Sequence, residues 1–273
     1  MAISNFISTV WSETLLQSLG KRYIGVANCN RSFEGDIRER GAVVKICGVG
    51  AVGVGDYTKN TDMSAPQTLD DTLCELTIDQ AKYFNFQIDD IDRAQASPRL
   101  MSEAMRVAAA ALADTADAYI YSLSGEAGET LSADAVTSDT IMDVLIEART
   151  SLYRAGVTDM ADAVIEVSPE VAALILKAKI ALSSDNGEAL EAGCLGSIGG
   201  CRIYVSSNIV KDGTRHKCLA RTKRAMAFAE QLSEIDAYRP EKRFADAVKG
   251  LHLDGAKVVY PAEMILLDLG LDA

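Results

Sequence analysis

The sequence lacks the features that mark membrane proteins, zinc proteins and nucleic-acid-binding proteins. None of its apolar runs reaches the roughly 18 residues of a membrane-spanning helix, and it opens without the pattern of a signal peptide. The six cysteines form no CxxC pair, and the two histidines, His216 and His252, do not complete a zinc spacing. Lys and Arg number 27 against 39 Asp and Glu, so the net charge is -12. We therefore expect no membrane partner, no sequence-specific nucleic-acid binding, and reduced thiols in a cytoplasm.

Two motifs resemble binding or catalytic sites, but their surroundings do not support that chemistry. Residues 48–53 spell G-x-G-x-x-G, the loop that holds a dinucleotide where a helix follows it. No helical periodicity follows here, so a flexible glycine-rich ribbon is the better interpretation. Asp89, Asp90 and Asp92 lack the spacing of a calcium loop, and no G-x-S-x-G marks a nucleophile. We predict no catalytic residue, cofactor or metal; a nucleotide-dependent cytoplasmic enzyme is the alternative from a different class.

Basic residues gather in one run, 211–223. Its members are Lys211, Arg215, His216, Lys217, Arg221 and Lys223. Because charged side chains are seldom buried, we interpret the run as a surface loop or a patch between subunits.

Residues 1–79 contain little apolar material from which to build a core. In residues 1–35, Leu15, Leu16 and Leu19 suit a short helix that ends at Gly20. In residues 36–79, a β-prone run at 42–47 and an alternating run at 75–79 predict a long two-stranded ribbon. Such a ribbon is marginally stable alone, so we expect other chains to cover both segments.

The clearest helix spans residues 97–123. Ser97 suits the N-cap, and Pro98 suits the first helical position, where its missing N–H costs nothing. At 1.5 Å per residue the helix would be about 40 Å long. Its predicted apolar stripe consists of Leu100, Ala104, Val107, Ala111, Leu112, Ala118 and Tyr119.

The remaining residues predict mixed helices and strands. We expect a helix from about 138 to 156 whose apolar face consists of Ile141, Val144, Leu145, Ala148 and Leu152. A buried strand at 163–167 follows, and then a helix that Ser168-Pro169 opens and that runs through 182. A glycine-rich loop at 193–200 precedes strands at 202–205 and 219–229. Asp254-Gly255 predicts a type I′ turn between strands at 248–253 and 256–260.

Three stretches and the order of these segments resemble a known family. Residues 196–208 (GSIGGCRIYVSSN) resemble a stretch of many phage capsid proteins, and residues 237–251 resemble the region where such chains return to their peripheral domain. Residues 6–12 (FISTVWS) look like the start of coat proteins in the P22-like group. The chain is thus similar to the HK97-fold major capsid proteins of tailed bacteriophages.

That resemblance implies an α+β fold of five segments. They are an N-terminal arm (1–35), an E-loop (36–79), a P-domain with a long spine helix (80–135), an A-domain (136–232) and P-domain return strands (233–273). It also implies that pentamers and hexamers form an icosahedral head around packaged double-stranded DNA, a virion component assembled in the host cytoplasm. A separate scaffolding protein, a portal and decoration proteins are the implied partners. An encapsulin-type nanocompartment shell is the alternative within the same fold.

The resemblance further implies where subunits meet. The E-loop contacts would be Val49, Val54, Asp56, Tyr57 and Lys59, those of the arm Phe6, Ile7 and Trp11, and those of an A-domain loop Gly193 and Gly196. Lys59-Asn60 lies where some relatives form isopeptide cross-links, although that chemistry also needs an Asn and a catalytic Glu on neighbours.

Overall fold

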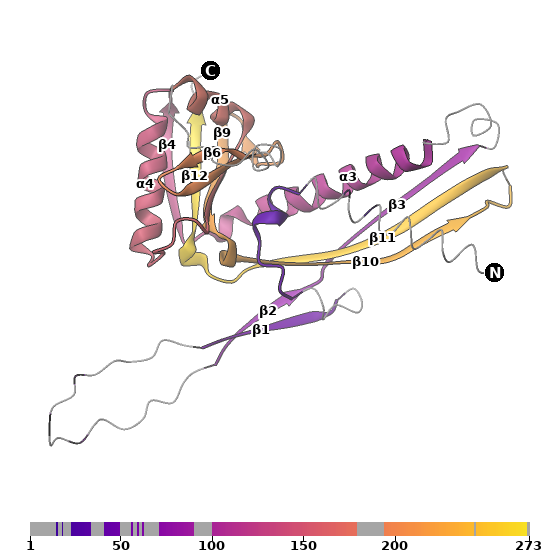
Figure 1. Cartoon of the computed structure of the whole chain (residues 1–273), viewed down its shortest axis with the longest axis horizontal. Helices are drawn as coiled ribbons and strands as arrows, with labels where there is room; N and C mark the ends of the chain where they lie inside the picture. Colours follow the sequence, from indigo (N-terminus) through magenta and orange to yellow (C-terminus); the bar gives the residue numbers. More distant parts are fainter. Residues whose placement is uncertain are drawn as a thin grey trace.

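Two β-sheets, a two-stranded ribbon and three helices carry the fold of the described residues (Figure 1). The computed structural model describes residues 15, 18, 23–33, 41–49, 56, 59, 62, 71–89, 100–178, 194–242 and 244–271. Within those ranges, no helix combines the length and the apolar character that crossing a membrane requires. Short 3-10 turns at Val26–Asn28, Leu123–Glu126, Lys223–Ala225 and Pro261–Glu263 join the larger elements.

The seven-stranded sheet is the larger of the two. Its strands run in the order β4 (Glu129–Val136), β12 (Met264–Leu271), β9 (Arg215–Thr222), β5 (Ala163–Val167), β7 (Cys201–Val205) and β6 (Cys194–Ile198), with β8 (Lys211–Asp212) paired to β9. All five residues of β5 are buried, which confirms the buried strand predicted at 163–167. Because β4 and β12 lie in this sheet, the segments 80–135 and 233–273 each contribute to both sheets.

Helices α4 (Ile141–Arg154) and α5 (Pro169–Lys177) accompany this sheet and follow local sequence signals. α4 buries Ile141, Leu145, Ala148 and Leu152, four members of its predicted apolar face. At the start of α5, the Ser168 hydroxyl accepts a hydrogen bond from the Val171 N–H at 3.4 Å, and Pro169 follows the cap. The residues beyond 178, where we predicted the end of this helix, lie outside the described range.

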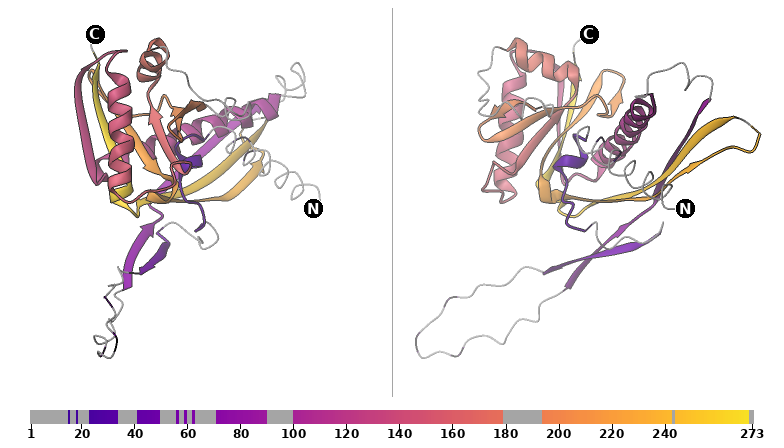
Figure 2. Two further views of the ribbon diagram at one scale, coloured as in Figure 1. Left: turned by 60° about the vertical axis from the view of Figure 1, so that its left-hand side comes forward. Right: turned by 45° about the vertical axis from the view of Figure 1, so that its right-hand side comes forward.

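The three-stranded sheet is long and narrow. Strands β10 (Met226–Tyr238), β11 (Ala245–Val258) and β3 (Gln80–Asp89) are antiparallel in the order β10-β11-β3. Helix α3 (Leu100–Ser122) runs beside them (Figures 1 and 2). The helix is confirmed over these residues, and its predicted cap at 97–98 falls outside them.

The apolar stripe predicted for α3 was wrong at most positions. The buried apolar positions are Met105, Ala109, Leu112, Ala113, Ala116, Ile120 and Tyr121, of which only Leu112 was predicted. Val107, by contrast, is 58% exposed, and Ala111 and Ala118 are also exposed. Alanine occurs on every side of this helix, so its spacing does not distinguish the face that packs on the sheet from the opposite face.

The hairpin turn predicted at Asp254-Gly255 was also wrong. β11 continues without interruption through both residues, which pair with Glu230 and Ala229 of β10. A Cβ on Gly255 would lie 2.4 Å from the backbone oxygen of Thr77 and 3.0 Å from Ile78 Cα. Glycine is needed here because another strand crosses closely, not because the chain turns.

The ribbon predicted for 36–79 is confirmed as β1 (Val43–Val49) paired with β2 (Asp71–Thr77) in antiparallel register. Its base does not depend on other chains, however. Val44, Ile46, Leu76 and Ile78 are buried in a small core that also holds Ala227, Ala229 and Leu253 of the long sheet. From this base, β1 and β2 run away from the two sheets (Figures 1 and 2).

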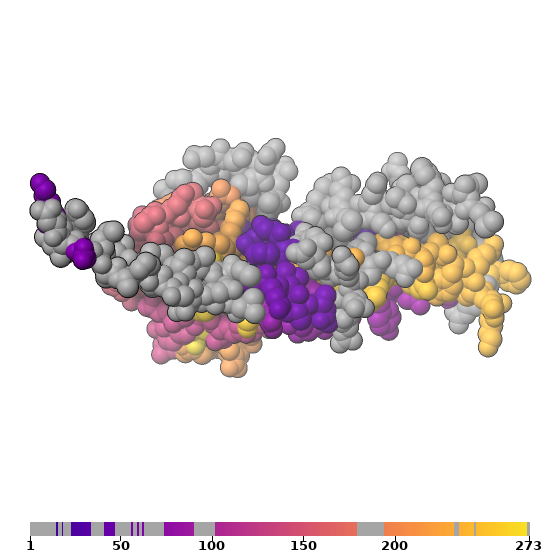
Figure 3. Space-filling view, turned by 90° about the horizontal axis from the view of Figure 1, so that it is seen from below, coloured from indigo at the N-terminus to yellow at the C-terminus, as the bar shows by residue number. Residues whose placement is uncertain are grey.

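Part of the N-terminal segment also packs on its own chain. Leu15, Tyr23, Val26 and Cys29 belong to the main hydrophobic core, and Asn30 bridges to Ala227 of β10. Figure 3 shows the indigo part of the chain, which includes residues 23–33, near the middle of one face. We had expected residues 1–35 to be covered by a neighbour; for 23–33, here called the anchor segment, that expectation is wrong.

Candidate assembly surfaces

The residues predicted to contact other subunits are only partly described. Val49 is the last residue of β1, and Asp56 and Lys59 are exposed. Gly196 is not in a loop: it is a buried residue of β6 with a φ of 143°, inside a hairpin with β7. The others, Phe6, Ile7, Trp11, Val54, Tyr57 and Gly193, lie outside the described residues, as does Asn60.

The other sequence motifs do not form a catalytic or metal site in the described part of the chain. Gly48 and Val49 end a strand of the antiparallel ribbon and pair with Thr72 and Asp71, which is not the parallel sheet of a dinucleotide fold. Asp89 is the exposed last residue of β3, and Asp90 and Asp92 lie outside the described residues. No group of three His, Cys, Asp or Glu side chains in the described ranges could hold a metal ion.

The basic run at 211–223 is not one patch, which corrects the sequence interpretation. Lys211 pairs with Glu170 at 2.6 Å, and Arg215 pairs with Asp134 and Asp268 at 2.5 and 3.0 Å. Arg221 is fully buried in the sheet. Consecutive basic residues on a strand point to opposite faces, so they do not add to a single positive surface.

Arg221 instead joins the seven-stranded sheet to the anchor segment. Its guanidinium donates to both carboxylate oxygens of Glu166 at 3.0 Å, and to the backbone oxygens of Gly25 and Asn28 at 2.9 and 2.7 Å. Arg221 and Glu166 are both 0% exposed. Burial alone would lower the pKa of Arg221, but Cys29 and Glu166 beside it raise that pKa overall. The guanidinium therefore stays charged in the core, donates to the Asn28 carbonyl and adds a donor to the Gly25 carbonyl, which also accepts from the Asn28 N–H at 3.2 Å.

A second buried carboxylate holds the same segment from α3. Asp117 accepts hydrogen bonds from the backbone N–H groups of Ile24 and Val26, both at 2.9 Å. Burial raises the pKa of Asp117 to about 6, although these two N–H donors oppose the rise. At neutral pH the ionised carboxylate thus receives the N–H groups at the start of the 3-10 turn, where the backbone has unpaired donors.

A third polar cluster joins the anchor segment to the long sheet. His252 Nε2 lies 2.9 Å from Glu230, and its Nδ1 lies 3.4 Å from Asp254. Glu230 also accepts from the Tyr23 hydroxyl and pairs with Arg31. Burial by itself would lower the pKa of His252, but hydrogen bonding to the Asp254 and Glu230 carboxylates raises it to about 9. The histidine therefore stays protonated at neutral pH.

This cluster gives a prediction for pH dependence. Because the pKa of His252 is raised from 6.5 to about 9, its contribution is complete below pH 6.5 and is lost as the pH rises through 9. We expect the free energy of unfolding of the unassembled protein to fall by about 3 kcal/mol between pH 6.5 and 9.5. Urea unfolding followed by circular dichroism at several pH values measures this fall, and His252→Gln should remove most of it.

The second histidine supplies the matched control. Burial lowers the pKa of His216, so its proton is already lost below the window in question. His216→Gln should therefore keep the slope of the wild-type protein between pH 6.5 and 9.5. An unchanged slope in His252→Gln would contradict the role given to the cluster.

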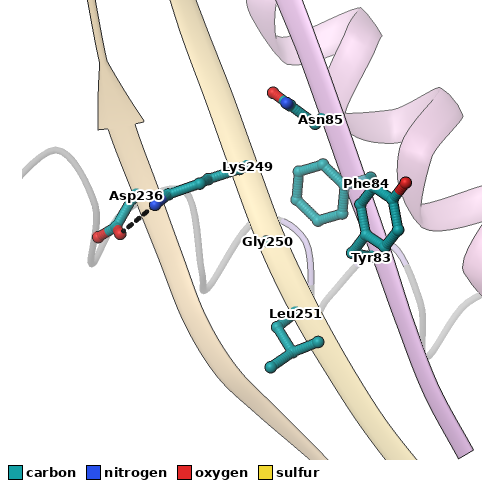
Figure 4. Close-up of a pocket in the computed structure, with 7 residues that line it drawn as sticks. All are labelled: Tyr83, Phe84, Asn85, Asp236, Lys249, Gly250 and Leu251. Carbon is teal, nitrogen blue, oxygen red and sulfur yellow. Dashed lines mark ion pairs between the residues drawn. The ribbon is translucent and has the colours of Figure 1, made fainter.

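Exposed apolar side chains gather on the outer face of the long sheet. Tyr83 of β3 is 79% exposed and Leu251 of β11 is 38% exposed, and the two are register partners. With Asn85 and the Lys249–Asp236 ion pair they line a shallow pocket of about 300 Å³ (Figure 4). Sequence reasoning missed this surface, although the alternation along 80–89 was a signal for a half-exposed strand.

A larger apolar groove lies between β3 and α3. It has a volume of about 720 Å³. Its lining includes Phe84, Phe86 and Ile88 from the strand, and Ala104, Val107, Ala108 and Ala111 from the helix. The residues wrongly assigned to the core face of α3 thus form an accessible apolar surface, which is typical of a site for another polypeptide.

Neither a protein-family model nor a curated protein sequence matches the chain, but solved structures do. A structure of Mycobacterium phage Che8 is 30% identical, with a TM-score of 0.71 over 90% of each chain. The capsid of Ralstonia phage GP4 is 12% identical, with a TM-score of 0.72 over 93% of this chain and 91% of that one. A virus-like particle from Pyrococcus furiosus is 11% identical, with a TM-score of 0.60 over 96% and 99%. The last two similarities concern the fold alone, whereas the first indicates a common family.

Proposed function

Because this chain belongs to the HK97-like major capsid proteins of tailed bacteriophages, we propose that many copies close into an icosahedral head around packaged double-stranded DNA. The role is structural, and we assign no catalytic residue, cofactor or metal to it. Closed symmetry allows each contact to be weak, since the same interface repeats over the whole shell.

The ribbon is the observation that carries this proposal. Its base is buried against β10 and β11, but β1 and β2 then leave the body, and Asp56 and Lys59 beyond them are exposed. A ribbon with no core of its own is marginal in water. We infer that it lies over an adjacent subunit, where burial of Val49, Val54 and Tyr57 would stabilise it.

The two sheets correspond to the two domains that we expect in such a subunit. We propose that the long sheet with α3 is the P-domain with its spine helix, and that the seven-stranded sheet with α4 and α5 is the A-domain. Residues 1–14, including Phe6, Ile7 and Trp11, would then form the free part of the N-terminal arm, with the anchor segment as its fixed end. Pentamers and hexamers would form around the A-domain near Gly193.

Membership of this family also suggests partner proteins. We propose assembly in the host cytoplasm with a separate scaffolding protein and a portal, and with decoration proteins as a further class of partner. Cross-linking through Lys59 would need an Asn and a catalytic Glu on neighbouring copies.

Electron microscopy of the purified protein tests the proposal. Negative staining should show closed isometric shells, and particles isolated from an infection should contain double-stranded DNA. Shells that hold a protein cargo would instead support an encapsulin-type nanocompartment. A protein that never assembles, and whose melting temperature rises with NAD(P) or ATP, would support the nucleotide-dependent enzyme.

A further inference from the structure

Strand β3 forms one edge of the three-stranded sheet as far as the structure describes it. Within the part of the chain that the structure describes, β3 pairs with β11 alone, in unbroken register from Gln80 to Asp89. It contains no proline and one basic residue, Lys82. Natural proteins normally protect such an edge with bulges, prolines or several charges, because its free N–H and C=O groups invite pairing with another chain.

The apolar groove lies directly beside this edge. On the strand side, the groove is lined by every residue from Phe84 to Asp89. Residues from both faces of β3 therefore contribute to it. The groove therefore borders the backbone of β3 as well as one of its faces. On the helix side, Ala104, Ala108 and Ala111 are small, which leaves space for large side chains of an added strand.

The other face of the same edge carries one exposed aromatic side chain. Tyr83 stands out from β3, with its register partner Leu251 on β11, and the exposed residues after it, Asn85, Gln87 and Asp89, are polar (Figure 4). A strand added to β3 would thus place alternate side chains in the groove and its remaining side chains along this mixed face. The edge therefore suits a segment with apolar residues toward the groove and an apolar residue beside Tyr83.

Residues 5–11 (NFISTVW) have that character. They are β-branched or aromatic at five of seven positions, Phe6, Ile7, Thr9, Val10 and Trp11, and so favour a strand. Alternation would place Ile7 and Trp11 on one face and Phe6 and Val10 on the other. Residues 1–12 also contain no charged side chain, so none would have to be buried against the apolar lining of the groove.

The position of the anchor segment indicates which copy supplies the strand. Asn30 bridges to β10, and Tyr23 and Arg31 bind Glu230 of β10. β10 is the opposite edge of the sheet from β3. Because the anchor segment is attached at the β10 edge, a neighbouring copy can present residues 5–11 to β3 without spanning the three-stranded sheet.

We propose that residues 5–11 of a second copy add as a fourth strand to the free edge of β3, with apolar side chains in the groove against α3. This rests on the proposed function, since it requires many copies in one shell. It gives Phe6, Ile7 and Trp11 a specific place of contact.

Photocross-linking tests the contact. p-Benzoylphenylalanine replaces Val107, which is 58% exposed in the groove, or Ile146, which is 47% exposed on α4 and serves as the control. In assembled particles, irradiation at position 107 should give a covalent dimer whose tryptic digest contains the peptide 1–21 joined to the peptide that carries position 107. Position 146 should not give an adduct with the peptide 1–21. An adduct with the ribbon, with another protein or within a single chain would overturn the proposal.

Hydrogen exchange provides a measurement that needs no probe in the groove. The amide groups of 80–89 should exchange more slowly in wild-type particles than in unassembled protein. Ala111→Arg, in the groove, should remove this protection, whereas Ala118→Arg, exposed on the same helix outside the groove, should keep it. Shells that form without protection of β3 would overturn the strand addition and leave the proposed function intact; failure to form any shell would overturn both.

Discussion

Replacing Arg221 by Met should lower the free energy of unfolding by about 3–5 kcal/mol, because it leaves the Glu166 carboxylate buried without its cation. Glu166 would keep one donor, the Asn28 side chain at 3.1 Å. The backbone oxygens of Gly25 and Asn28 would also lose the guanidinium that they accept from. Since those carbonyls belong to the anchor segment, its release should accompany the loss of stability.

Urea unfolding of the unassembled protein measures the first effect, and limited proteolysis within residues 23–33 measures the second. The double variant Arg221→Met with Glu166→Gln should recover part of the stability, because it removes the unpaired charge but does not restore the hydrogen bond to the Asn28 carbonyl. Arg106→Met is the surface control: that arginine pairs with Glu103 on the exposed side of α3, and its loss should leave the unfolding curve unchanged. A stability of Arg221→Met equal to that of the wild-type protein would contradict the anchoring role.

Sequence reasoning succeeded where the signal is local. The cap at Ser168-Pro169, the face of α4 and the buried run of β5 depend on neighbouring residues, so their pattern is sufficient to predict them. The ribbon also followed from local alternation and glycine content. These elements, in their chain order, were enough to suggest the family.

Two of the errors concern contacts between distant segments. Asp254-Gly255 has the composition of a turn, yet the glycine is required by Thr77, which comes from another strand. Arg221 looks like part of a surface run, yet its partner Glu166 is 55 positions away. Neither partner can be deduced from spacing, because only the tertiary fold brings them together.

The candidate surfaces were predictable to a similar degree. The sequence indicated that the ribbon and the N-terminal arm contact other subunits. The individual contact residues, however, were inferred from the resemblance to phage capsid proteins. It did not indicate Tyr83 or the groove beside β3, because exposure of an apolar residue depends on which strand forms the edge of the sheet. The anchor segment was expected on a neighbour because its three polar attachments, at Arg221, Asp117 and Glu230, have no local signature.

Deletion of residues 50–66 should abolish shell formation and leave a soluble, folded monomer. Val49 of β1 and Asp71 of β2 form the outermost pair of the ribbon. The deletion leaves residues 67–70 between them, a four-residue connection of a common hairpin length. The base of the ribbon, with Val44, Ile46, Leu76 and Ile78 in its small core, should therefore keep its structure.

Two measurements separate folding from assembly in this variant. The urea unfolding curve should match that of the wild-type protein, because the buried residues that form the two described cores all lie outside the deleted stretch. Sedimentation and electron microscopy should show monomers where the wild-type protein gives shells. A variant that replaces 50–66 with a Gly/Ser segment of equal length is the matched control: loss of shells there too would show that the side chains of the ribbon are needed, not its length alone. Normal particles from the deletion would mean that the ribbon does not hold neighbouring subunits together, and the shell would then have to depend on the two sheets and the N-terminal arm.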